Sequence, residues 1–137
     1  MKGEVFLDTA YTIALSSLSD QFHQRAVHLV REIRAAEARL VTTRAIMVEI
    51  GNALSKQRQR QAGIKLLHAL EVDSRVDIVP LSEQLYERAW QLFRERPDKE
   101  WSLTDCVSFV VMQDRGLTEA LTTDEHFQQA GFQPLMR

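Results

Sequence analysis

The chain has few of the residues that cross-link a fold or interrupt its helices and strands. It contains one cysteine, three prolines and five glycines among 137 residues. With a single cysteine, Cys106, an internal disulfide is excluded, which is typical of a protein in a reducing compartment. No apolar run approaches the roughly 20 residues that a membrane-spanning helix needs. The first residues, MKGEVFLD, place an acid where a signal peptide keeps its apolar segment. We therefore expect a cytoplasmic protein with no membrane association.

A strong charge of either sign is also missing. The 17 basic and 19 acidic residues give a net charge of −2, which taken alone argues against a nucleic-acid partner. If four acids served as metal ligands, however, the remaining surface would carry more basic than acidic residues. The overall charge therefore decides nothing about such a partner. The length and the ordinary apolar fraction of 45% predict a single globular domain over residues 1–137.

Short apolar runs alternate with longer segments of helical periodicity. The expected strands are residues 4–7, 38–43, 76–81, 117–123 and 131–135. Between them, apolar residues recur every three or four positions, which is typical of amphipathic helices; residues 43–60 are expected to form one helix. Strands that alternate with helices predict parallel pairing, with helices on both faces of one sheet. In such an α/β fold, ligands bind beyond the carboxyl ends of the strands.

Four carboxylates stand at positions of interest in this scheme. Asp8 follows the first expected strand and Asp124 the fourth, so both are expected at the same edge of the sheet. Asp105 heads the apolar run WSLTDCVSFVVM, and Glu49 lies within the apolar segment AIMVEIGNAL. Helix capping offers a structural explanation for each aspartate, and Ser102 with Asp105 resembles a capping box. Capping does not explain Glu49, because an unpaired buried carboxylate is costly and no Lys or Arg lies three or four positions away.

If these acids converge, they need a cation. Carboxylates in a poorly solvated pocket repel one another by several kcal/mol, and a bound metal ion removes that repulsion. Oxygen ligands without His or Cys are typical of Mg²⁺ or Mn²⁺ sites rather than of zinc sites. We therefore expect a Mg²⁺ (or Mn²⁺) centre of the kind that serves phosphoryl chemistry.

Four stretches carry a resemblance to a known family: FLDTAYTIALSSLSDQFHQRA, TTRAIMVEIGNAL, WSLTDCVSFVVM and ALTTDEHFQQAGF. In this order and spacing the chain resembles the PIN-domain ribonucleases, above all the VapC-like toxins of type II toxin–antitoxin pairs. The resemblance extends over nearly the whole chain. It implies a three-layer α/β/α sandwich around a five-stranded parallel sheet. It also implies an acidic tetrad that holds the metal and is catalytic, formed by Asp8, Glu49, Asp105 and Asp124, with a nearby hydroxyl from Thr9 or Thr122.

The activity implied by this resemblance is divalent-metal-dependent endonucleolytic hydrolysis of RNA. The implied partners are the RNA substrate, a small antitoxin protein and a second copy of the chain in a homodimer. Basic residues near the sheet edge would contact phosphates, although a solvated helix face is the better explanation for each cluster and none is counted as a site residue. These candidates are Lys56, Arg58, Arg60, Lys65, Arg94, Arg96 and Lys99.

Two other functions remain open at this point. A catalytically inactive PIN-like scaffold would bind RNA or protein without cleaving it. A receiver-like signalling domain also binds Mg²⁺ with acids at strand ends, but it needs paired acids after the first strand and a lysine after the last. Here Thr9 follows Asp8, and GFQPL contains no lysine.

Several residues near these motifs have plainer interpretations. Trp101 is expected to anchor its loop rather than to stack on a base, and Cys106 is expected in the core. His126 reads as a surface histidine at a helix start. Most apolar residues of the early helices are expected in the core, although they could also contact a partner; these are Tyr11, Ile13, Leu15, Leu18 and Phe22.

Overall fold

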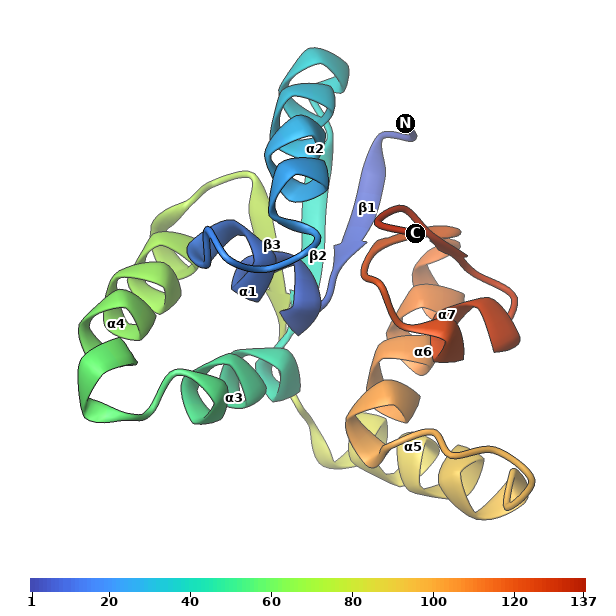
Figure 1. The fold of residues 1–137 in the computed structure, drawn as a ribbon. Helices are drawn as coiled ribbons and strands as arrows, with labels where there is room; N and C mark the ends of the chain where they lie inside the picture. Colours follow the sequence, from blue (N-terminus) through green and yellow to red (C-terminus); the bar gives the residue numbers. More distant parts are fainter.

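A five-stranded, wholly parallel sheet forms the centre of the computed structural model, which describes all 137 residues (Figure 1). Its strands are β1 (Glu4–Leu7), β2 (Arg39–Thr43), β3 (Val76–Val79), β4 (Glu119–Leu121) and β5 (Gln133–Pro134). The strand order is β3-β2-β1-β4-β5, so the chain builds outward from β1 first on one side and then on the other. The strand order therefore reverses between β1 and β4, the place where such sheets bind ligands.

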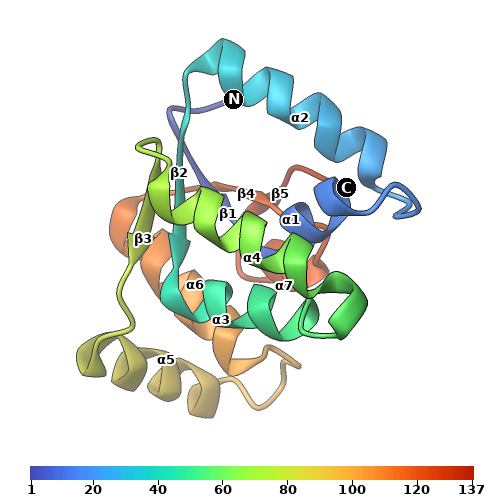
Figure 2. The same cartoon turned by 90° about the vertical axis from the view of Figure 1, so that its left-hand side faces the viewer.

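Seven helices cover the two faces of the sheet. They are α1 (Thr9–Ser16), α2 (His23–Ala36), α3 (Arg44–Ala53), α4 (Gln57–Val72), α5 (Glu83–Glu95), α6 (Leu103–Arg115) and α7 (Glu125–Gln129). Figure 1 shows α1, α2 and α4 on one side of the strands and α5, α6 and α7 on the other, and Figure 2 looks onto the first group. The predicted three-layer α/β/α sandwich is confirmed. No helix has both the length and the apolar character needed to cross a membrane.

The core lies on both sides of β1 and around α6. Val5 and Phe6 of β1 have no exposed surface, as expected for a central strand of a parallel sheet. Every residue of α6 from Cys106 to Met112 is buried, because α6 is covered by the sheet on one side and by α5 on the other. The core position predicted for Cys106 is confirmed.

Trp101 anchors the loop before α6, as predicted. It is buried, its Nε1 donates a hydrogen bond to Gln129 Oε1 over 3.0 Å, and its ring meets Phe109 edge-on. The early apolar residues are also mostly core. Tyr11 is buried and Ile13 packs against the core, whereas Leu18 is almost fully exposed.

The continuous helix expected over residues 43–60 is wrong. Helix α3 ends at Ala53, and α4 begins at Gln57 after an extended Lys56. Leu54 turns inward and is buried, and a Cβ at Gly63 of α4 would lie 2.9 Å from Leu54 Cβ. The break is therefore a packing contact that brings α4 back against the end of α3. It also means that the basic residues Lys56, Arg58, Arg60 and Lys65 do not continue the helix that bears Glu49.

Four of the expected strands are shorter than predicted, β2 by one residue at its start. Strand β3 ends at Val79, before Pro80, whose missing N–H cannot extend the ladder. Strand β4 ends at Leu121 because the chain turns at Thr122, whose N–H bonds back to the carbonyl of Ala120. Strand β5 is reduced to Gln133 and Pro134. The early end of β4 places the side chains of residues 122–124 beyond the sheet edge.

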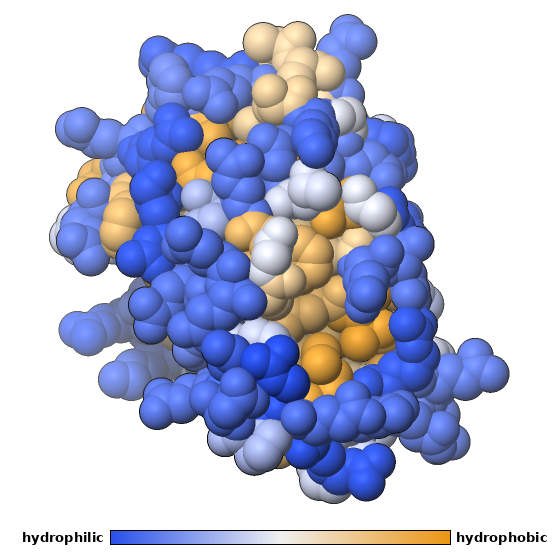
Figure 3. Space-filling model, turned by 90° about the vertical axis from the view of Figure 1, so that its right-hand side faces the viewer, coloured by the Kyte–Doolittle hydropathy of each residue, from blue (hydrophilic) through white to orange (hydrophobic).

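Large apolar side chains remain exposed on α5. Tyr86, Trp90 and Phe93 are 45%, 42% and 40% exposed, and the last two rings stack on each other. A neighbouring pocket is lined by Leu92, Arg96, Trp101, Phe109, Gln113, Gln129, Ala130 and Phe132. Figure 3, which views the molecule from the side of α5, α6 and α7, shows apolar surface gathered within a hydrophilic border. A surface of this kind is typical of a protein-binding face.

Candidate metal centre

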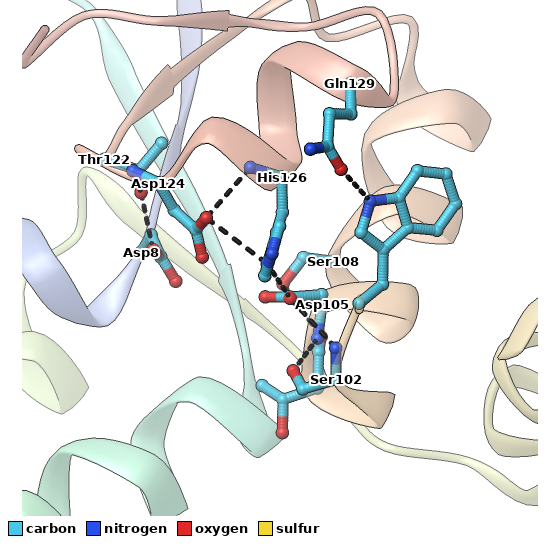
Figure 4. Close-up of polar contacts among 10 residues, drawn as sticks. Asp8, Ser102, Asp105, Ser108, Thr122, Asp124, His126 and Gln129 are labelled. Atoms are coloured by element: carbon cyan, nitrogen blue, oxygen red, sulfur yellow. Dashed lines mark hydrogen bonds and ion pairs between the residues drawn. The ribbon is translucent and has the colours of Figure 1, made fainter. Parts of the chain in front are cut away.

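Asp8 lies at the carboxyl edge of the sheet, directly after β1. Strands β1 and β4 pair with Leu7 opposite Leu121, so the residues that follow both strands meet at this edge. Thr122 Oγ1 donates a hydrogen bond of 2.7 Å to Asp8 Oδ2 (Figure 4). Asp8 occupies the N-cap position of α1, yet its side chain makes no capping hydrogen bond. Capping therefore does not explain this carboxylate.

The environment of Asp8 disfavours its charged form. Only 8% of the residue is exposed, and burial raises the pKa of its carboxyl from 3.8 to about 7. The Thr122 hydrogen bond lowers this pKa, while the neighbouring charges of Glu49 and Asp105 raise it further. A cation close to Asp8 would reverse this balance and favour the carboxylate.

Glu49 approaches the same edge from α3. Its Oε1 accepts a hydrogen bond from Thr9 Oγ1, in the first turn of α1. Glu49 is half-buried rather than interior, because it lies between the buried face of α3, which carries Met47 and Ile50, and the exposed Val48. Both candidate hydroxyls, Thr9 and Thr122, thus donate to carboxylates of the predicted tetrad.

Asp105 is both a capping residue and a member of the cluster. Ser102 N donates to Asp105 Oδ2 over 3.0 Å, and Asp105 N donates to Ser102 Oγ over 2.9 Å, which completes a capping box. Burial raises the pKa of the Asp105 carboxyl above its usual value, and the charge of Asp124 adds to this rise. The capping interpretation is therefore correct, and it leaves the carboxylate within the acidic cluster.

Asp124 is the N-cap of α7 and completes the set. Its Oδ1 accepts a 2.9 Å hydrogen bond from His126 N, and its own N–H donates to Thr122 Oγ1 over 3.0 Å. The structure thus brings Asp8, Glu49, Asp105 and Asp124 to one edge of the sheet, from β1, α3, α6 and the turn after β4. Their metal-binding and catalytic roles stay predictions.

His126 is the residue of this site that sequence reasoning missed. Its Nδ1 lies 3.0 Å from Asp105 Oδ2 and 3.3 Å from Asp124 Oδ1. Figure 4 shows the ring pointing toward both carboxylates. His126 lies at a helix start, as predicted, but its side chain is half-buried, 24% exposed, and faces two carboxylates rather than solvent alone. The available signal was its position two residues after Asp124, which places it in the first turn of the helix that Asp124 caps.

The fold and the site together define a class of protein: an α/β domain whose parallel sheet carries an acidic cluster where the strand order reverses. A family model described as the PIN domain matches residues 5–133. The chain belongs to the PIN-domain family.

The chain is also similar to individual proteins of known name. It is 26% identical over 129 residues to the 23S rRNA-specific endonuclease VapC20 of Mycobacterium tuberculosis, covering 93% of this chain and 95% of that protein. The crystal structure of VapC20, described as a Sarcin-Ricin loop cleaving toxin, aligns with a TM-score of 0.81 at 25% identity over 93% of this chain and 95% of that one. VapBC2 from Rickettsia felis, solved bound to a DNA fragment from its promoter, shares the fold, with a TM-score of 0.66 at 14% identity and 96% coverage of both chains.

Proposed function

We propose that the chain is a divalent-metal-dependent endoribonuclease that acts as the toxin of a toxin–antitoxin pair. The observation that carries this proposal is the gathering of four carboxylates at one edge of a PIN-domain sheet, one of them with a pKa of about 7. Acids held this close, with burial opposing their charge, fit a site made for a cation.

Asp8, Glu49, Asp105 and Asp124 would hold Mg²⁺ or Mn²⁺. A divalent ion at such a site activates water and neutralises the charge that develops on a phosphodiester in the transition state. The chain itself positions the ligands. Thr9 and Thr122 orient two carboxylates through hydrogen bonds, and the buried helix α6 holds Asp105 rigidly.

RNA would be held near this edge by its phosphates. Lys56, Arg58 and Arg60 are exposed at or near the start of α4 and would supply such phosphate contacts. Arg96 is less suited, since it pairs with Asp98 and lies over the Trp101 ring.

The similarity to VapC20 supports a specific substrate, the sarcin–ricin loop of 23S ribosomal RNA. We expect the purified chain to cut an RNA stem-loop with that sequence at one position when Mg²⁺ or Mn²⁺ is present. The measurement is gel analysis of an end-labelled stem-loop beside a second one with the loop nucleotides shuffled. Equal cleavage of the two stem-loops would reject the specific substrate but leave the proposed ribonuclease activity standing. No cleavage of any RNA with either metal would favour the inactive scaffold.

The same proposal includes the partners and the compartment. A toxin that cuts ribosomal RNA acts in the cytoplasm and is kept harmless by a small antitoxin that covers the acidic edge. The exposed aromatic side chains of α5 (Tyr86, Trp90 and Phe93) support a homodimer through this helix. Light scattering on the 15.8 kDa chain, alone and mixed with the product of the adjacent gene, tests the homodimer and the antitoxin complex. A chain that stays monomeric and does not bind that product would reject both.

A further inference from the structure

One nitrogen donor lies inside the oxygen cluster. One ring nitrogen of His126, one oxygen of Asp105 and one oxygen of Asp124 all lie within 4.8 Å of one another. The two nitrogen–oxygen distances are 3.0 Å and 3.3 Å. Adjacent ligand atoms of an octahedral ion with bonds of about 2.1 Å lie roughly 3 Å apart. The two nitrogen–oxygen distances are therefore compatible with neighbouring ligands of one ion, and in the metal-free chain the 3.0 Å contact is a hydrogen bond between His126 Nδ1 and Asp105 Oδ2.

The three donors are held in place by the backbone. His126 N donates to Asp124 Oδ1, which ties the histidine to the first turn of α7. The capping box with Ser102 ties Asp105 to the first turn of α6. The two helices contact each other, so the donors converge without any movement of a loop. Such pre-orientation is what a metal site requires of its ligands.

We infer that His126 Nδ1 is a metal ligand beside Asp105 and Asp124, and that it makes the centre prefer Mn²⁺ over Mg²⁺. This inference rests on the proposed metal-dependent function and adds a nitrogen donor to its carboxylate tetrad. Magnesium takes oxygen ligands almost exclusively, whereas imidazole nitrogen suits transition metals. With the metal bound, the ring proton resides on Nε2 and Nδ1 offers its lone pair. The proposal thus adds one nitrogen to the all-oxygen donor set expected from the sequence.

Pulsed electron paramagnetic resonance of Mn²⁺ bound to the full chain tests this directly. A ligating imidazole gives a nitrogen modulation in the electron spin echo, which no carboxylate produces. We expect this modulation in the wild type and in His68→Gln, a control on the exposed surface of α4. We expect it to be absent in His126→Gln. Manganese affinity should fall about tenfold or more in that variant, with a much smaller change for Mg²⁺.

The outcomes separate this inference from the proposed function. Bound Mn²⁺ without nitrogen modulation in the wild type would overturn the role of His126 and leave the carboxylate centre intact. Modulation that persists in His126→Gln would also overturn it, since the nitrogen would come from elsewhere. A wild-type chain that binds no Mn²⁺ would overturn both. Circular dichroism of each variant shows whether the chain is folded.

Discussion

Replacing Asp105 with Asn is expected to lower RNA cleavage by more than about 100-fold without unfolding the chain. Residues that only support a metal ligand commonly contribute 10- to 100-fold to affinity or activity, so loss of a ligand charge should have a larger effect. Asparagine keeps an oxygen that accepts the Ser102 N–H, so the capping box survives. The measurements are the cleavage rate of the sarcin–ricin stem-loop and the melting temperature.

Two matched variants separate catalysis from capping. Ser102→Ala removes the hydroxyl that caps α6 and should cost about 1 kcal/mol of stability. Because the Ser102 N–H still binds Asp105 Oδ2, cleavage should fall by much less than in Asp105→Asn. Asp114→Asn removes an exposed carboxylate at the opposite end of the same helix and should leave cleavage unchanged. An Asp105→Asn protein that cleaves as fast as wild type would show that Asp105 is only a capping residue.

The stability of the metal-free chain should fall as the pH rises, because of Asp8. Its folded-state pKa, about 7, lies above its unfolded value. The folded chain therefore favours the protonated carboxyl, whose stabilising contribution is fully present below about pH 4 and is lost as the pH rises through about 7. The free energy of unfolding should decline by up to ~4 kcal/mol across this range.

Urea unfolding in EDTA at a series of pH values measures this decline, with Asp8→Asn as the reference. The asparagine cannot titrate, so the variant should lose less stability toward high pH. Added Mg²⁺ should restore the free energy of unfolding of the wild type at high pH, because a ligand that binds the folded state stabilises that state. Parallel pH profiles for both proteins would contradict the raised pKa of Asp8.

The fold could be predicted because its signals are local and repeated. Apolar runs such as EVFL, separated by helical periods, are enough to predict a parallel sheet, and Asp8 and Asp124 follow strands that proved to be neighbours. Convergence of the acids then follows from topology. The identity of the family was also carried by these motifs in their order.

The errors came from contacts between segments far apart in the sequence. The break between α3 and α4 depends on Leu54 packing against Gly63, which no periodicity over residues 43–60 reveals. His126 looked like a surface residue because its partner Asp105 lies 21 residues away on another helix. Glu49 looked interior because its neighbours in the sequence are apolar, although it lies between the buried face of α3 and the exposed Val48.

The most direct test of the central claim is a cleavage assay on the RNA stem-loop. The chain is first freed of metal with EDTA and then given Mg²⁺ or Mn²⁺. That claim is that the four carboxylates hold a divalent ion on which hydrolysis depends. We predict no cleavage in EDTA, recovery when either metal is added back to the wild type, and no recovery in Asp105→Asn. Cleavage that continues in EDTA at the wild-type rate would contradict it.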